Sequence, residues 1–116
     1  MSSTFHDHYN YTDEYRRPLL SRIRREIREL DDGLIEKVTG AQRIAYSKRE
    51  RKVFLEVKVQ RRAIVLHMIN VPDPNKVLAK VPESHEWRQL TGRVKIETAP
   101  ELERILPLIR AAYLRG

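Results

Sequence analysis

The sequence predicts an α+β fold, a two-layer sandwich in which an antiparallel sheet of about four strands carries an N-terminal and a C-terminal helix on one face. Near both ends of the 116-residue chain, apolar residues recur every three or four positions, as in amphipathic helices. Between them, two alternating apolar runs are separated by three polar residues, which favours an antiparallel hairpin. The predicted element order is therefore α-β-β-β-β-α.

The first helix is predicted to begin near Pro18, because proline needs no N–H partner in a first helical turn. Its apolar face comprises Leu19, Leu20, Ile23, Ile27 and Leu30. Gly33 follows two aspartates and is expected to end the helix in a left-handed conformation. Residues 1–17 show no clean period and are predicted to form a flexible extension, so one α+β domain is expected over residues 18–116.

The predicted strands are Arg43–Tyr46, Lys52–Val59, Ala63–Ile69 and Arg93–Glu97. In the second of them, strict alternation directs Phe54, Glu56 and Lys58 to the face opposite its valines. Lys76–Val81 is expected to form a helical turn capped by Asp73.

The last helix is predicted from a capping box, Thr98 with Glu101, and is expected to run to about Arg115. Pro107 falls opposite the apolar stripe of this helix, where it should bend the helix around the core. Both helices then cover one face of the sheet, and Lys58, Arg93 and Lys95 should appear on the other.

Positive charge is concentrated in the middle of the chain. Lysine and arginine number 23 and aspartate and glutamate 16, for a net charge of +7. Residues 41–65 contain eight of the basic residues and two of the acidic ones. A localised positive field attracts polyanions. The chain contains no cysteine and no apolar run of membrane-spanning length, which favours a cytoplasmic protein with neither disulfides nor a membrane partner.

This charge predicts a sequence-tolerant binding module for DNA or RNA. The predicted contacts lie in two turns and on the strand between them: Lys48, Arg49, Arg51, Lys52, Lys58, Arg61 and Arg62. Tyr46 and Phe54 are expected to stack on bases if they are exposed beside these residues. A solubilising surface is the alternative explanation of the charge.

A protein-interaction or dimerisation module is the second prediction. Trp87, the sole tryptophan, lies in an irregular segment, where such a residue either covers a core or anchors an interface. Phe54 is a further candidate interface residue, and the strand Arg93–Glu97 is expected to be a sheet edge open to pairing. Monomer and homodimer both remain open.

No catalytic constellation is predicted, so we expect neither an enzyme, nor a metal, nor a cofactor. His6-Asp7-His8 offers metal-binding side chains without a further ligand nearby in the sequence. His67 is interpreted as a half-buried strand histidine, and Glu56-x-Lys58 as the polar face of an amphipathic strand. His85, beside Glu83 and Glu86, is the one acid–base pairing in the sequence, and neighbours on one loop rarely form a catalytic unit.

Several segments together resemble a known family. They are Arg43-Ile44-Ala45-Tyr46, Val53-Phe54-Leu55-Glu56-Val57, Gln60-Arg61-Arg62 and the closing Leu108-Ile109-Arg110-Ala111-Ala112-Tyr113. Over about Leu19 to Tyr113 the chain resembles the bacterial and archaeal family called domain of unknown function 5655, whose members carry the label predicted transport protein. Some members are joined to nuclease-like or restriction-related proteins. The resemblance therefore implies an accessory role beside a larger nucleic-acid-processing protein.

The chain departs from that family before its last strand. The family has a glycine-rich His-x-Gly-x-Gly stretch there, whereas the segment from His85 to Gly92 keeps the histidine and one glycine. A function tied to that stretch is therefore not implied for this chain.

Overall fold

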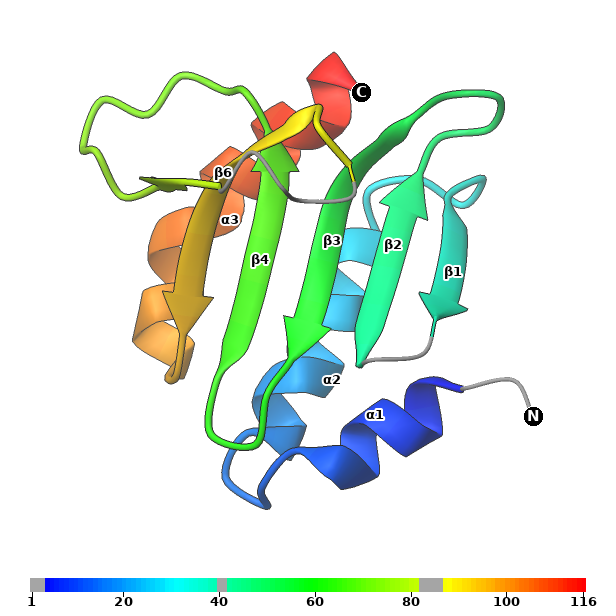
Figure 1. Ribbon diagram of the computed structural model, residues 1–116, viewed down its shortest axis with the longest axis vertical. Helices are drawn as coiled ribbons and strands as arrows, with labels where there is room; N and C mark the ends of the chain where they lie inside the picture. The colour runs from blue at the N-terminus through cyan, green and yellow to red at the C-terminus, as the bar shows by residue number, and fades with distance from the viewer. Residues whose placement is uncertain (1–3, 40–41, 82–86) are drawn as a thin grey trace.

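A six-stranded antiparallel sheet with two long helices on one face forms the body of the protein (Figure 1). The computed structural model describes residues 4–39, 42–81 and 87–116. The elements are α1 (Phe5–Tyr11), α2 (Arg17–Arg28), β1 (Ile35–Thr39), β2 (Arg43–Ser47), β3 (Val53–Val59), β4 (Ile64–Ile69), β5 (Ala79–Lys80), β6 (Leu90–Ile96) and α3 (Ala99–Arg115). The strands lie in the order β1-β2-β3-β4-β6-β5. The predicted α+β class and the helices at both ends of the fold are confirmed.

The number of strands differs from the prediction of about four. The sequence alone did not indicate β1, because two charged residues, Glu36 and Lys37, are adjacent in it and break the alternation of apolar and polar side chains. The two-residue strand β5 lies where a helical turn was predicted for Lys76–Val81. The predicted helical turn does not form, but the carboxylate of Asp73 accepts hydrogen bonds from the backbone N–H groups of Val77 at 3.0 Å and Leu78 at 2.8 Å.

The main core lies between the helices and the sheet. From α2 it takes Leu20, Ile23 and Ile27, and from α3 Leu102, Ile105 and Ile109. The sheet contributes alternate residues of its central strands: Ile44, Leu55, Val57, Val59, Ile64, Leu66 and Ile96. Each of these side chains is almost completely removed from water, and this burial is the main stabilising contribution to the fold. The apolar residues that recur with helical spacing and those that alternate along the strands therefore pack together in one core between the two layers.

The end of α2 differs from the prediction. The helix ends at Arg28, and Gly33 does not have a positive φ angle. Its backbone N–H instead donates to the Asp31 carboxylate at 2.8 Å, a local turn that an aspartate forms with the residue two positions on. The prediction of a left-handed glycine terminator is therefore wrong.

Part of the segment predicted to be a flexible extension is folded. Thr4 and Asp7 form a capping box that begins α1. After α1, the Thr12 hydroxyl donates to the Gln60 carbonyl at 2.7 Å, and the Asp13 N–H donates to the Arg61 carbonyl at 2.7 Å. These two hydrogen bonds fasten the chain between α1 and α2 to the turn that joins β3 and β4.

The final helix runs over the predicted range. Glu101 accepts hydrogen bonds from the Glu97 N–H at 3.2 Å and the Thr98 hydroxyl at 3.0 Å. The Thr98 hydroxyl accepts no hydrogen bond from the helix backbone, and Glu101 accepts from the Glu97 N–H instead of the Thr98 N–H, so the predicted capping box does not form. Pro107 is exposed, on the side away from the core, as expected. None of the helices within the described ranges is long and apolar enough to cross a membrane.

Candidate nucleic-acid interface

The face of the sheet opposite α2 and α3 carries a cluster of positive charge. In an antiparallel sheet, residues directly opposite one another on neighbouring strands point to the same face and form rows. One row across this face consists of Lys37, Ala45, Glu56, His67 and Arg93. The adjacent row consists of Arg43, Lys58, Val65 and Lys95. We call the surface formed by Lys37, Arg43, Lys58, Arg93 and Lys95 the basic face.

The basic face differs from the cluster that the sequence predicted. Of the predicted contacts, Lys58 lies on it. The Nζ of Lys48 lies 4.3 Å from the ring centre of Tyr113 in α3, which places this lysine on the helix side. Arg61 stacks on Tyr11 at 5.1 Å, beyond one end of the sheet, and Arg62 is exposed in the same turn.

The remaining predicted contacts lie beyond the other end of β3. Arg49, Arg51 and Lys52 are exposed in the turn between β2 and β3. Arg51 and Lys52 line a shallow cavity of about 380 Å³ together with Gln89 and Arg115. The seven predicted residues therefore do not form one continuous surface. The register of the strands brings together a different set of cations, the basic face. The alternation of side chains along single strands indicated only some of its members.

Phe54 belongs to the core and has no exposed side-chain surface. The pairing of β2 with β3 shifts between Tyr46 and Ser47, so that Phe54 is an extra residue in β3. A bulge of this kind breaks the alternation of side chains. Phe54 is fully buried and packs edge-on against Tyr113, with ring centres 5.9 Å apart. Tyr46 is also buried, at 1% exposure, so the condition for base stacking by these two aromatic residues is not met.

A buried carboxylate and a buried imidazole lie together at the centre of the basic face. Glu56 and His67 are directly paired residues of β3 and β4, and the Nδ1 of His67 lies 2.9 Å from the Oε1 of Glu56. Their exposed fractions are 0% and 5%, although none of the helices in the described ranges covers this face. The interpretation of Glu56 as an ordinary polar side chain on an amphipathic strand is therefore wrong, whereas a satisfied histidine at position 67 agrees with the structure.

The sequence contains a signal that would have found this pair. The β3–β4 turn is closed by a hydrogen bond from the Gln60 N–H to the Ala63 carbonyl at 2.9 Å. Counting outward from this turn in an antiparallel hairpin pairs Val59 with Ile64 and, three residues further on, Glu56 with His67. Charged or titratable residues at equal distances from a tight turn are thus candidates for a cross-strand pair.

The segment before β6 crosses this face of the sheet (Figure 1, yellow). The Gln89 side-chain amide donates to the Val53 carbonyl at 3.2 Å, so the segment spans β4 and reaches β3. Trp87 lies in this segment and is partly buried. Of the strand predicted to be an open edge, Arg93–Glu97, Arg93 is paired with the two-residue strand β5, and among the described residues Val94–Ile96 has no β5 partner.

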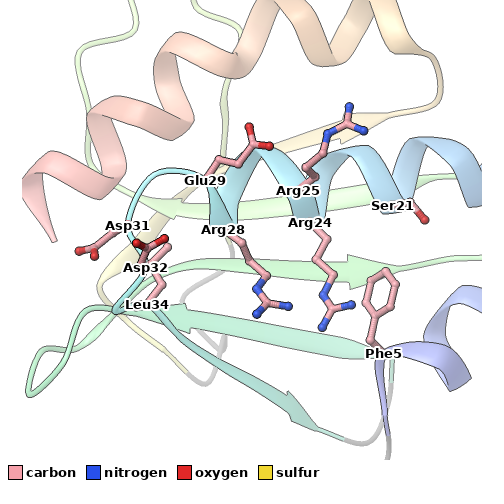
Figure 2. Close-up of a pocket in the computed structure, with 9 residues that line it drawn as sticks. All are labelled: Phe5, Ser21, Arg24, Arg25, Arg28, Glu29, Asp31, Asp32 and Leu34. Atoms are coloured by element: carbon pink, nitrogen blue, oxygen red, sulfur yellow. The ribbon is translucent and has the colours of Figure 1, made fainter.

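A groove of about 490 Å³ lies on the other side of the sheet, between α2 and β1. Figure 2 shows Arg24 and Arg28 reaching from α2 toward β1, with Phe5 beside Arg24. Arg24 donates two hydrogen bonds to Glu36, at 2.9 and 2.7 Å, and its guanidinium lies 4.2 Å from the Phe5 ring centre. The positive charge of Arg24 is thus neutralised within the protein.

The same carboxylate accepts a third hydrogen bond, from the Tyr46 hydroxyl at 2.7 Å. Burial opposes ionisation of Glu36, but the hydrogen bonds from Arg24 and Tyr46 outweigh it and lower the pKa of this carboxyl. Burial, reinforced by the bond to Glu36, raises the pKa of Tyr46 above its ordinary value. We therefore regard this network as structural.

Those of the other chemical candidates that lie in the described ranges do not assemble into a site. In the described part of the chain, no three histidine, aspartate or glutamate side chains lie close enough to hold a metal ion. The Asp7 carboxylate accepts the Thr4 N–H, and the His8 Nδ1 lies 3.1 Å from the Thr4 carbonyl. His85 and its neighbours Glu83 and Glu86 lie outside the described residues.

Comparison with known proteins adds no assignment. No family model matches the chain, and no curated protein or solved structure shows significant similarity to it.

Proposed function

We propose that the protein binds nucleic acid through its basic face, without strong sequence preference. The observation that carries this proposal is the set of cations on the helix-free face, which come from β1, β2, β3 and β6. Neighbouring strands lie about 4.8 Å apart, so this array extends over about 19 Å. A phosphate backbone crossing the sheet would meet several of these charges at once, and phosphate contacts supply most of the sequence-independent affinity for nucleic acids.

The charge balance on this face supports the proposal. Glu56 is fully buried on this face and paired with His67, so its carboxylate does not reach the surface. Lys95 is paired loosely with Glu97 at 3.9 Å, and an exposed pair at this distance contributes little. Tyr46 and Phe54, which come from two of the strands that form this surface, are buried and are not exposed to bases. Backbone contacts rather than base stacking would therefore dominate.

Fluorescence anisotropy tests this proposal. Fluorescein-labelled single- and double-stranded DNA and RNA are titrated with the full chain at low salt and again near physiological salt. The variant Lys58→Gln/Lys95→Gln should bind about tenfold more weakly at low salt. The slope of log K against log salt should become shallower by about two contacts.

The matched control is Arg104→Gln/Arg110→Gln, which removes the same charge from exposed positions on α3. It should bind within about twofold of the unmodified protein. If both variants lose the same affinity, the net charge and not the basic face is responsible. If no nucleic acid binds at low salt, the proposal is wrong. A second variant, Arg61→Ala/Arg62→Ala, measures how far the binding surface extends past the β3–β4 turn.

A further inference from the structure

We infer that the outer edge of β1 is a docking site for an extended acidic segment of another protein, which adds to the sheet as a further strand. The inference goes beyond the proposed function, because it concerns the edge of the sheet and not the basic face. Addition of a peptide strand to a sheet edge is a recurring mode of recognition. Backbone hydrogen bonds supply its affinity, and alternate side chains of the added strand supply its specificity.

Strand β1 offers a regular edge. All five of its residues pair in register with β2, and the strand contains no proline, glycine or bulge. It is outermost in the sheet, so within the described ranges the backbone groups along its other side have no strand to pair with. Such a row of backbone groups is a template for a further strand. On the opposite side of the sheet, β5 has two residues, which is too short for a comparable template.

An arginine without a partner lies beside this edge, on the helix side. Arg28 is exposed on α2 and lines the groove of about 490 Å³, and Figure 2 shows it reaching toward β1 next to Arg24. The two arginines are one helical turn apart but differ in their contacts. Arg24 is held by Glu36, whereas among the described residues Arg28 has neither a hydrogen bond nor an ion pair. A carboxylate on an added strand would supply a charged partner for Arg28.

The other face of the same edge is partly apolar. Ile35 and Lys37 alternate with Glu36 and therefore point away from α2. Ile35 is 46% exposed, and Lys37 is exposed beside it. A β-branched side chain of the added strand would cover Ile35 and pack against the aliphatic part of Lys37. The edge therefore fits a segment in which acidic residues, on the helix side, alternate with apolar or hydroxyl-bearing ones.

The charges favour such a segment over a second copy of this chain. A two-fold axis that pairs all five residues of β1 with another β1 passes through the middle residue, Lys37, and sets this lysine opposite its own copy. Like charges directly opposite one another destabilise a strand pair. On the helix side the second strand would present Glu36 and Val38, and that Glu36 is already bonded to its own Arg24. An acidic strand meets neither obstacle.

Fluorescence anisotropy of the peptide Glu-Val-Glu-Thr-Glu-Val-Glu, labelled at one end and amidated at the other, tests the docking. At low salt the full chain should bind it with a Kd of about 100 μM or tighter. Arg28→Gln should weaken binding about fivefold, because one charged pair is lost. The matched control, Arg104→Gln, removes an exposed arginine of α3 and should bind within about twofold of the unmodified protein. Arg28→Gln should also bind nucleic acid within about twofold, because Arg28 is not part of the basic face.

Two N-methylated peptides separate strand addition from charge attraction. Alternate residues of a strand direct their backbone N–H groups to opposite edges. Methylation of the valine and threonine nitrogens therefore blocks one edge, and methylation of the internal glutamate nitrogens blocks the other, while the charge is unchanged. One of these peptides should bind at least about tenfold more weakly, because it loses hydrogen bonds to β1. The other should bind within about threefold of the original peptide.

Nuclear magnetic resonance of the isotope-labelled protein locates the bound peptide. Changes in backbone amide shift should be largest at Ile35–Thr39 and small at Lys58 and Lys95. Larger changes at those two lysines would mean that the peptide binds the basic face, and the inference would be wrong.

Four other results would overturn the inference. The first is no binding of the unmodified peptide, and the second is equal weakening by both patterns of methylation, which indicates charge attraction without strand pairing. The third is an equal loss of affinity in Arg28→Gln and Arg104→Gln, since the groove then plays no part. The fourth is a chain that sediments as a dimer and is dissociated by the peptide, because a second copy then occupies the edge. None of these results bears on nucleic-acid binding, which is measured separately.

Discussion

The two faces of the sheet are built from alternate residues of the same strands, yet they differ in charge and in packing. The face toward the helices is apolar, and its one carboxylate, Glu36, is neutralised by Arg24 and Tyr46. The opposite face carries cations, and Glu56 on this face is buried and paired with His67, which lies directly opposite Arg93. On the first face the partner of the carboxylate is an arginine, whereas on the second it is a histidine directly opposite on the neighbouring strand. The comparison shows that the helix side carries the apolar core, whereas the cations gather on the other side.

The largest expected effect tests which face Phe54 belongs to. Phe54 and Lys58 have the same parity in β3, but the bulge turns Phe54 into the core. Phe54→Ala should lower the free energy of unfolding by about 4 kcal/mol, because it opens a cavity against Tyr113. Lys58→Ala, at a surface position, should change it by less than about 0.5 kcal/mol. Urea unfolding measures both, and equal effects would contradict this assignment of faces.

A smaller effect is expected at the hydroxyl group of Tyr46. Tyr46→Phe keeps the buried ring and removes one of the hydrogen bonds to Glu36, at a cost of about 1 kcal/mol. Tyr15→Phe is the matched control, because Tyr15 is 76% exposed and should tolerate the change without loss. Equal unfolding midpoints for the two variants in urea would show that the hydroxyl contributes nothing to the helix-side network.

The pH dependence of stability should report Glu36. Its pKa is below the ordinary value because the hydrogen bonds from Arg24 and Tyr46 outweigh the opposing effect of burial. A carboxyl whose pKa is lowered by folding stabilises the protein above its unfolded pKa of about 4.3, and this contribution disappears as the pH falls through the folded value. Glu36→Gln should therefore flatten the loss of stability below about pH 4. The exposed Glu14→Gln should leave that dependence unchanged.

The smallest expected effect concerns Asp31, where β1 and α3 approach each other. The Gly33 N–H, and secondly the Tyr113 hydroxyl at 2.8 Å, hold the pKa of this carboxyl below its ordinary value. Tyr113→Phe should let the pKa of Asp31 rise part of the way back, since the backbone donor remains. A carboxyl-carbon NMR titration measures the change, and an unmoved midpoint would mean that the tyrosine bond does not persist in solution.

The sequence predicted those parts of the fold that are local in the chain. The apolar period from Leu19 to Ile27, the alternation around Val57 and the limits of α3 all reflect the repeat of a single element. Strand β1 was missed because its five residues carry no clear alternation of apolar and polar side chains. The bulge at Phe54 was also missed, because it depends on how two strands pair and not on the residues of one.

The site was harder to predict for the same reason. Arg43 and Lys58 are fifteen positions apart in the chain and become neighbours only through the register of β2 with β3. Arg93 joins them because β4 lies between β3 and β6. Charge density along the chain therefore pointed to the turns around Arg49 and Arg61. The register of the strands instead gathers the residues of the basic face on the sheet between those turns.

The bonds from Thr12 and Asp13 to the β3–β4 turn have a consequence for the timing of folding. They join groups that are 48 and 49 positions apart in the chain, whereas the β3–β4 hairpin to which they bind is closed by a turn of a few residues. During synthesis, α1 and α2 leave the ribosome well before the turn exists, so they must remain undocked until that hairpin emerges. The amphipathic face of α2 is then exposed to other chains and to chaperones for that interval. The hydrogen bonds from Thr12 and Asp13 to the β3–β4 turn can form only after this interval, when the strands that bury the apolar face of α2 are also available.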